Sequence, residues 1–318
     1  MRILLASGER LSGVLVKELL AAGHQIVGVM SPIPKRVMSQ QFRGLRYWRK
    51  NLRGWDIRDV CVAARIPIRV TENLSEGSIH SMIKQSRPDL LLVFSWPRLI
   101  KNETLRLFPR GGMNIHPSLL PQFRGGDPLF FVLDSGSESM GLTFHRITSE
   151  LDAGPIYLQV PLPQKPTDCY DDLYFRTIQS AAHFLPAALE AQDRNPSGTE
   201  QEGEAIYCPK FTTQLTYLNP SAPAVETSRR ARACYPHHPM LFQVGRRKFR
   251  FKRCLETGVR SQLPNGTILR VGWSSLDVVL DGHVCRLTKV RRSGWAPLWM
   301  PLLLLRLRKG KMIAEPTS

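Results

Sequence analysis

The sequence lacks several patterns that would assign a function at once. Its six cysteines are never closer than 20 residues, so it has no C-x-x-C pair of the kind that binds zinc or forms a catalytic dithiol. The longest apolar run, Trp295–Leu305, contains two prolines and is about half of the roughly 20 residues that a transmembrane helix needs. No secretory hydrophobic region precedes the first cysteine. We therefore expect a cytoplasmic protein with reduced thiols, no membrane association and no metal site.

The glycine turn that follows the first apolar segment also lacks two familiar motifs. Residues 7–13 read Ser-Gly-Glu-Arg-Leu-Ser-Gly, which matches neither G-x-G-x-x-G nor G-x-x-x-x-G-K-[ST]. The glycines and the lysine that cradle phosphates in those motifs are missing. The pattern therefore excludes a dinucleotide-binding turn and a P-loop at this position.

Hydrophobic periodicity organises the first two thirds of the chain. The short apolar runs that predict strands are 2–6, 25–30, 90–94, 141–147 and 155–161. The segments with apolar residues at helical spacing are 11–20, 56–64, 78–85 and 173–189. Strands that alternate with helices favour a parallel sheet with helical crossovers. The predicted fold is α/β, with an open, mostly parallel, Rossmann-like sheet.

A different pattern follows Pro220. A helix is predicted at 224–234, and after it come short strands separated by glycine turns, at 249–252, 266–271, 276–280 and 283–290. A small OB-like β-barrel is the natural way to close such strands. A chain of 318 residues fits two domains. We predict a first domain at 1–205, a linker at 206–222 and a basic β-barrel domain at 223–318.

The formal net charge of +18 is unevenly distributed. Residues 220–318 carry +14 and residues 33–58 carry +7, whereas residues 59–219 carry −4. A solvated surface is the alternative for any single basic run, but tryptophans between the cations of 33–58 suit base stacking as well as phosphate contact. We expect a nucleic-acid partner. The candidate contacts are Arg43, Arg46, Trp48 and Arg49 in the first zone and Arg246, Arg247 and Lys248 in the second.

The densest chemical signal is the segment from Gly112 to Pro128. Asn114 and His116 are two residues apart, so at the end of a strand they project from the same face. Asp152 lies in the loop between two later strands and is expected to reach the same place. An amide, an imidazole and a carboxylate without a nearby nucleophile suit direct acyl transfer to an amine. The alternative is a structural histidine and a turn aspartate, and His145, inside an alternating strand, is interpreted as a packed histidine.

These residues resemble a known family. The run Asn114-Ile-His-Pro-Ser-Leu-Leu-Pro121, then Arg124-Gly125 and Pro128, and the later Leu151-Asp-Ala-Gly-Pro155 are similar to the signature of the folate-dependent formyltransferases. Further segments resemble the two-domain methionyl-tRNA formyltransferases; they are Tyr207-Cys-Pro-Lys210, the region of Arg232-Ala233 and Pro264-Asn-Gly-Thr-Ile-Leu269. The resemblance runs from about residue 1 to about residue 292.

The resemblance implies an enzyme that transfers the formyl group of 10-formyltetrahydrofolate to the amino group of methionyl-initiator-tRNA, as a monomer and without a metal. It implies that Asn114, His116 and Asp152 are the catalytic residues. It also implies a folate site, whose residues are Ser118, Leu119, Leu120, Pro121, Phe94, Ser95 and Trp96. The resemblance further implies a formyltransferase domain followed by a tRNA-binding barrel.

The sequence departs from the family pattern at two places. The usual Thr-Pro-x-Phe turn after the first strand is replaced by Ser7-Gly-Glu-Arg-Leu11, and the small pair after Arg-Gly is replaced by Gly126-Asp127. Both changes lie where the acceptor is expected to approach. The alternative acceptor is an amino sugar linked to a nucleotide, and the alternative of another class is a nucleic-acid-binding protein that has lost its transferase activity. The +14 region favours tRNA, and the intact trio favours an enzyme.

Overall fold

The structure, a computed structural model, describes residues 1–32, 54–292 and 307–314. These residues form two compact units. Unit 1 comprises 1–128, 139–163 and 174–209, and unit 2 comprises the remaining described residues, 129–138, 164–173 and those from 210 onward. The contiguous domain boundaries expected from the sequence stay a prediction.

Unit 1 is built on a seven-stranded sheet with the strand order β3-β2-β1-β4-β5-β6-β7. The first five strands in this order are parallel, and β6 pairs antiparallel with both β5 and β7. The strands are β1 (Arg2–Ser7), β2 (Gln25–Ser31), β3 (Ile68–Val70), β4 (Leu90–Phe94), β5 (Gly112–His116), β6 (Gly141–Arg146) and β7 (Ile156–Pro161). The predicted open, mostly parallel sheet is confirmed.

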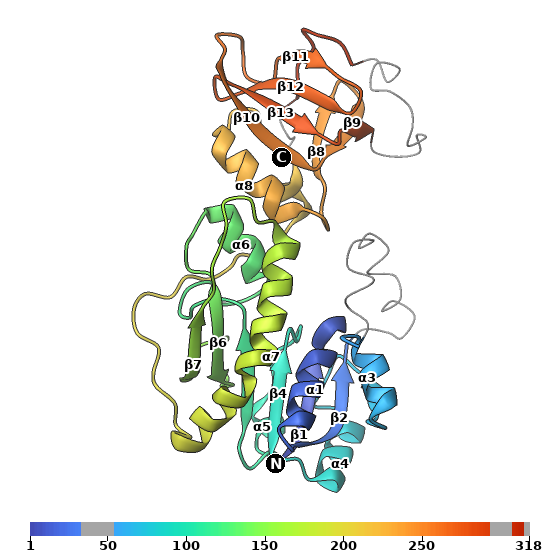
Figure 1. Ribbon diagram of the computed structural model, residues 1–318, viewed down its shortest axis with the longest axis vertical. Helices are drawn as coiled ribbons and strands as arrows, with labels where there is room; N and C mark the ends of the chain where they lie inside the picture. The colour runs from blue at the N-terminus through green and yellow to red at the C-terminus, as the bar shows by residue number, and fades with distance from the viewer. Residues whose placement is uncertain (33–53, 293–306, 315–318) are drawn as a thin grey trace. The chain divides into compact units, whose positions relative to one another are not determined.

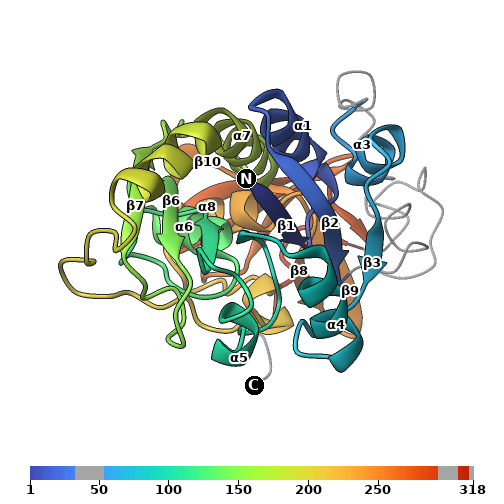
Figure 2. The ribbon, with the colours of Figure 1, turned by 90° about the horizontal axis from the view of Figure 1, so that it is seen from below.

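Helices cover both faces of this sheet. Figure 2 shows α1 and α3 on one face and α4 and α5 on the other. The helices of unit 1 are α1 (Gly13–Ala21), which follows the short η1 (Arg10–Ser12), α3 (Ile57–Ala63), α4 (Gly77–Ser86), α5 (Asn102–Leu105) and most of α7 (Tyr170–Arg194). This arrangement explains the continuous apolar runs of β1 and β4, because a parallel strand is buried on both faces.

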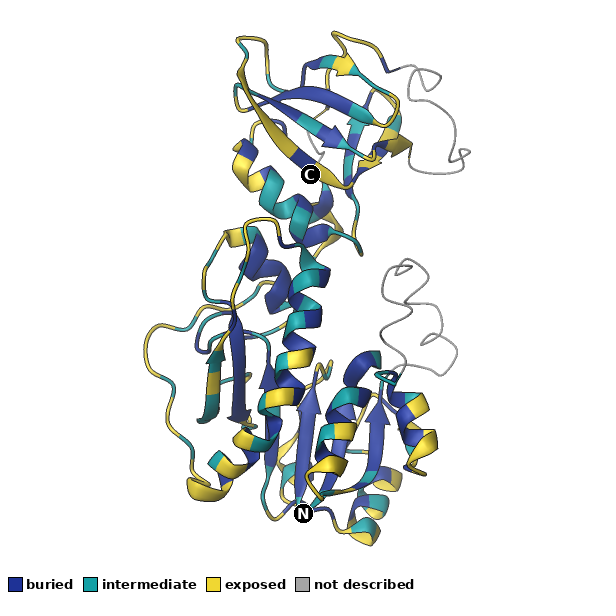
Figure 3. Cartoon of the chain, in the orientation of Figure 1, coloured by how far each residue is buried: buried dark blue, intermediate teal, exposed yellow. Residues whose placement is uncertain are grey.

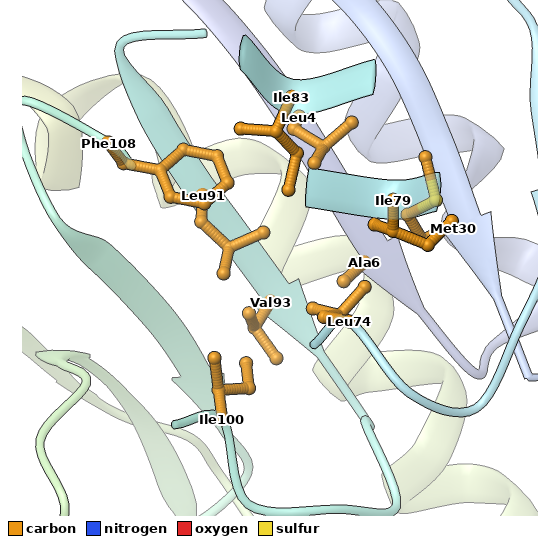
Figure 4. Close-up of a cluster of buried hydrophobic side chains, with 10 residues drawn as sticks. All are labelled: Leu4, Ala6, Met30, Leu74, Ile79, Ile83, Leu91, Val93, Ile100 and Phe108. Atoms are coloured by element: carbon orange, nitrogen blue, oxygen red, sulfur yellow. The ribbon is translucent and has the colours of Figure 1, made fainter. Parts of the chain in front are cut away.

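The core on the α4 side joins strands that are far apart in the sequence. Leu4 of β1 and Leu91 of β4 are fully buried there against Ile83 of α4 (Figure 4). Figure 3 shows the same central strands as the most deeply buried part of unit 1. This packing fixes where the ends of the central strands lie relative to one another.

The carboxyl ends of the central strands form one row. Ser7 of β1 pairs with Phe94 of β4, and Phe94 pairs with Ile115 of β5. After β1 the chain continues to β2 on one side of the sheet, and after β4 it continues to β5 on the other side. The direction in which strands are added therefore reverses between β1 and β4. Ligands bind at the carboxyl edge of such a reversal, which places the motif of β5 where chemistry is expected.

The described part of unit 2 contains antiparallel strands, the first residues of α7 (170–173), α6 (Pro128–Ser135), whose first residue falls in unit 1, and α8 (Ala224–Cys234), with the short η2 (Thr213–Thr216) before α8. The strands are β8 (Met240–Val244), β9 (Arg247–Phe251), β10 (Arg253–Arg260), β11 (Ile268–Val271), β12 (Ser275–Leu280), β13 (His283–Thr288) and β14 (Arg291–Arg292) (Figure 1). They form two sheets, β10-β13-β12-β11 and β14-β9-β8. The predicted β-rich region is confirmed, but the described strands do not close into one continuous barrel.

Within 1–32, 54–292 and 307–314, no helix is both long and apolar enough to cross a membrane. The same ranges hold no group of three or more side chains arranged to bind a metal ion. All six cysteines are free thiols.

Candidate active site

The three residues predicted as catalytic converge at the carboxyl edge of unit 1. Asn114 and His116 lie on β5, and Asp152 lies in the loop between β6 and β7. The Asn114 amide donates a hydrogen bond to Asp152 Oδ1 at 3.2 Å. His116 Nδ1 lies 3.6 Å from Asp152 Oδ2. The carboxylate of Asp152 is therefore the centre on which the amide and the imidazole meet.

Asp152 is held as an anion. Burial alone would raise the pKa of its carboxyl group, but the neighbouring His145 and His116 and the N–H of Gly125 lower that pKa to about 2. The Gly125 N–H donates to Oδ2 at 2.9 Å. The backbone of Asp152 is left-handed, with φ of +49°, a conformation that a non-glycine residue adopts at a small energetic cost. Such a residue at a buried charged centre is typical of a functional site.

His116 is buried with a defined proton arrangement. Its Nε2 lies 2.8 Å from the carbonyl oxygen of Phe123, and a carbonyl can only accept, so Nε2 carries the proton. Nδ1 then faces the carboxylate of Asp152 with a lone pair. Burial lowers the pKa of His116 despite the opposing attraction of Asp152, so the ring is neutral at pH 7. A proton that arrives at Nδ1 would lie directly beside a carboxylate.

His145 also belongs to this cluster. The residue is 2% exposed, as expected for a packed histidine, but Nε2 lies 3.1 Å from the Asn114 amide and 3.5 Å from Asp152 Oδ1. Nδ1 lies 2.9 Å from the carbonyl of Arg146, so in the neutral ring Nδ1 carries the proton and Nε2 accepts from Asn114. The contact follows from the pairing of Asn114 with His145 across β5 and β6. Alternation along one strand cannot reveal this pairing.

The loop that carries Asp152 is held by a residue that the sequence did not single out. The amide of Gln201 donates to the carbonyls of Asp152 and Gly154, each at 2.8 Å, and its oxygen accepts from the guanidinium of Arg124. A Cβ at Gly154 would come within 1.9 Å of the Arg146 carbonyl, so only glycine fits there. Arg124 and Gly154 of the motif therefore serve to position Asp152.

A pocket opens beside Asn114. It holds about 440 Å³ of empty space and continues to solvent. Asn114, His145 and Asp152 supply part of its polar wall, and Arg98 and Glu150 also line it. Its other lining residues include Trp96, Leu99, Ile100, Ile147 and Thr148. Aromatic and aliphatic walls with a few converging polar groups are typical of a small-molecule binding site.

The residues predicted for folate binding do not share one location: one lines the pocket, most are buried elsewhere, and one is exposed. Trp96 lines the pocket. Ser118 is fully buried and its hydroxyl donates to the Gln122 carbonyl at 2.6 Å, while Leu120 is 3% exposed. Leu119 packs over Gly141, Phe94 is a core residue of β4, and Pro121 is buried. Ser95 is exposed, and its hydroxyl donates to Glu9 at 3.0 Å. Apart from Trp96, none of these predicted residues is among those that line the pocket.

The predicted nucleic-acid contacts fall into two groups. Arg43, Arg46, Trp48 and Arg49 lie outside the described residues. Arg246 is exposed in the turn between β8 and β9, and Arg247 and Lys248 follow on β9. Lys248 Nζ donates to the Tyr217 hydroxyl at 3.1 Å and lies over that ring. For both groups of residues, contact with nucleic acid stays a prediction.

Known proteins match this chain over most of its length. A sequence profile of the family described as "Formyl transferase" matches residues 30–189. A "Methionyl-tRNA formyltransferase" of Borrelia hermsii is 30% identical over 237 residues, which are 74% of this chain and 73% of that protein. A "Methionyl-tRNA formyltransferase" of Treponema pallidum is 27% identical over 290 residues, 88% of each chain.

The fold is shared with solved structures as well. An N-formyltransferase from Helicobacter canadensis, in complex with folinic acid and dTDP-3-aminofucose, aligns with a TM-score of 0.61. It covers 90% of this chain and 98% of that one at 14% identity. At this identity the likeness concerns the fold alone.

Proposed function

The chain belongs to the formyl transferase family, and we propose that it transfers the formyl group of 10-formyltetrahydrofolate to the α-amino group of methionyl-initiator-tRNA. The observation that carries the chemistry is the meeting of Asn114 and His116 at the largely enclosed carboxylate of Asp152, beside a pocket. The sequence relatives named methionyl-tRNA formyltransferases support the acceptor.

The site favours direct transfer over a covalent intermediate. Cys208 is a cysteine close enough to Asp152 for the charge of that carboxylate to affect its pKa. Burial, together with the carboxylates of Asp127 and Asp152, raises the pKa of the Cys208 thiol to about 12. A thiol with this pKa is protonated at pH 7 and is a poor nucleophile. The amine of the acceptor therefore attacks the formyl carbon itself.

Each member of the trio has a role that its contacts support. The Asn114 amide, whose hydrogens point to Asp152 and His145 in the free protein, turns one of them to the oxygen of the tetrahedral intermediate. His116 accepts the proton of the attacking amine at Nδ1, the ring nitrogen that faces Asp152. The anion of Asp152 stabilises the resulting imidazolium. Proton transfer from this imidazolium to the departing folate nitrogen completes the exchange.

The pocket beside Asn114 is the proposed donor site. Trp96, Leu99 and Ile147 offer apolar contact to a flat pterin ring, and the loop 148–152 offers backbone groups for its polar edge. The folate supplies the formyl group, and the chain supplies orientation and the proton acceptor. No metal is part of this proposal.

The basic regions are the proposed contacts for tRNA. A nucleotide sugar with two phosphates needs two or three cations, whereas residues 220–318 carry a net +14. Arg246, Arg247 and Lys248 are the proposed contacts in unit 2. We further propose that the enzyme acts as a monomer in the cytoplasm.

One assay tests the function. The protein is incubated with 10-formyltetrahydrofolate and methionyl-initiator-tRNA, and the deacylated product is analysed for N-formylmethionine. A parallel reaction offers a nucleotide-linked amino sugar. Formylation of the tRNA alone is the expected result, and formylation of the sugar alone would overturn the acceptor while leaving the trio in place.

A further inference from the structure

The segment that follows α7 runs along both loops that meet at the active site. Residues 199–208, which we call the strap, belong to unit 1 throughout. The first residue of the strap exchanges two backbone hydrogen bonds with Ile156, the first residue of β7. Near its end, Arg124 donates to the Ile206 carbonyl and accepts from the Cys208 N–H, each at 2.8 Å. The strap is therefore held at the start of β7 and again at the loop after β5.

Gln201 lies between these two anchor points, and its amide uses all of its hydrogen-bonding capacity. A side-chain amide has two N–H donors and two acceptor lone pairs. The nitrogen of Gln201 donates to the carbonyls of Asp152 and Gly154, each at 2.8 Å. Its oxygen accepts from Nε and Nη2 of Arg124 at 3.2 and 2.8 Å. A glutamate at this position would have no donor for the two carbonyls.

The turn held by Gln201 has an uncommon backbone. Asp152 has a φ of +49°, and a non-glycine residue keeps such a conformation only where its surroundings enforce it. No other described residue donates to the carbonyl of Asp152 or to that of Gly154. Gln201 therefore supplies the side-chain support for this turn.

The oxygen of Gln201 connects the same turn to a second contact of the Asp152 carboxylate. Arg124 is 9% exposed and precedes Gly125, whose N–H donates to Asp152 Oδ2 at 2.9 Å. Oδ2 is also the oxygen that lies 3.6 Å from His116 Nδ1. One side chain therefore ties the segment that carries the carboxylate to the segment that donates to it.

We propose that Gln201 is a positioning residue for the transfer step and that it holds the Asp152 carboxylate at its distance from His116. The inference rests on the proposed function, in which the Asp152 anion stabilises the His116 imidazolium. The attraction between two charges falls with their separation, so a carboxylate that moves away from the ring stabilises the imidazolium less. A displacement of about 1 Å can cost on the order of 100-fold in rate. Gln201 acts through Asp152 and is not itself a catalytic residue.

A double-mutant cycle tests whether Gln201 acts through Asp152. The single-turnover rate of methionyl-tRNA formylation at saturating donor and tRNA is measured for the wild type, Gln201→Met, Asp152→Asn and the double variant. Gln201→Met keeps a side chain of similar length and removes its four hydrogen bonds. It should lower the rate about tenfold in the wild-type background and less than about twofold in the Asp152→Asn background. The second loss is smaller because the charge that Gln201 positions is already absent.

The variant Gln201→Glu separates the two halves of the amide. It keeps an acceptor for Arg124 but offers no donor to the two carbonyls of the turn. Its rate should fall at least as far as that of Gln201→Met. A wild-type rate in Gln201→Glu would show that the donors of the amide are not needed and would overturn the inference.

Gln192→Met is the matched control. Gln192 is a buried residue of α7 whose amide donates to the Arg110 carbonyl at 3.2 Å, and it is not among the residues that line the pocket beside Asn114. This variant should lose stability in urea but keep its rate per folded molecule. Circular dichroism measures the folded fraction of every variant.

The outcomes separate this inference from the proposed function. Equal fold losses in both backgrounds, or an unchanged rate in folded Gln201→Met, would overturn the inference and leave the proposed function intact. If the wild type formylates the nucleotide-linked amino sugar instead of the tRNA, the proposed function fails, and the same cycle with that acceptor decides the role of Gln201. A protein that formylates neither acceptor would overturn both.

Discussion

The charged groups of the two units are used in opposite ways. At the carboxyl edge of unit 1, the side chain of Asp152 is only 11% exposed and touches the Asn114 amide, the Gly125 N–H and two histidine rings. In unit 2, Arg246 in the turn between β8 and β9 and Lys248 on β9 are exposed. Bond-making requires groups at fixed distances, whereas attraction of a polyanion requires only a high density of charge. Perturbation of charge should therefore change turnover in unit 1 and affinity in unit 2.

Salt should separate the two units most strongly. If about six phosphates are neutralised, the affinity for tRNA should fall by roughly three decades between 50 and 200 mM salt. Donor affinity should change little, because the proposed donor pocket has mainly uncharged walls. Filter binding of tRNA and fluorescence titration of 5-formyltetrahydrofolate over the same salt series measure the two. If the affinities for tRNA and for folate fell equally steeply with salt, the contrast between the two units would be wrong.

Removal of one buried charge in unit 1 should have the next largest effect. Asp152→Asn keeps the size of the side chain, and asparagine tolerates the left-handed backbone at this position. Turnover at saturating substrates should fall on the order of 100-fold, because the imidazolium of His116 loses its counter-charge. Single-turnover formylation measures this loss.

Asp193→Asn is the matched control, since that carboxylate is half exposed at the end of α7 and pairs with Arg110. It should retain normal turnover. Circular dichroism of both variants verifies that they are folded. Normal turnover of a folded Asp152→Asn enzyme would show that the carboxylate has no part in the reaction.

The sequence predicted the strands of unit 1 and the catalytic trio better than the surroundings of that trio. Local patterns were sufficient for β1 and β4, because burial on both faces leaves continuous apolar runs. The motif placed Asn114 and His116 on one strand, and the structure brings Asp152 to them. His145 and Gln201 were missed as neighbours of the site, because their contacts depend on antiparallel pairing and on a loop 49 residues beyond Asp152.

Charge counting had a similar limit in unit 2. It located the basic region but could not show that Lys248 contacts Tyr217. The turns and short strands were recognisable from glycine and alternation, whereas their closure into a barrel was inferred by analogy. Sheet closure depends on which strand edges meet, and no local sequence signal reports that.

Neutralisation of the turn in unit 2 should have a smaller effect and only on binding. Replacement of Arg246, Arg247 and Lys248 by glutamine should weaken tRNA binding about tenfold at moderate salt and flatten the salt slope. Turnover at saturating tRNA should be unchanged. The control is Lys84→Gln, which removes an exposed cation from α4 in unit 1. A loss of saturated turnover in the triple variant would mean that these cations position the reacting group.

The smallest effect concerns pH and stability, and it too should be confined to unit 1. Burial lowers the pKa of His116 in the folded protein, whereas a histidine of the unfolded chain has a pKa of about 6.5. Between these two pKa values, the His116 ring is neutral in the folded protein and protonated in the unfolded chain. Protons therefore favour the unfolded state, and stability falls as the pH drops below about 6.5 toward the lowered folded pKa. His116→Gln removes this contribution, so its unfolding free energy should decline less steeply over that range than that of the wild type. Urea unfolding between pH 7.5 and 5.5 measures the two slopes, with His183→Gln, an exposed histidine of α7, as the control. Equal slopes for wild type and His116→Gln would mean that the buried ring takes up its proton without penalty, which contradicts its role as a neutral acceptor held ready beside Asp152.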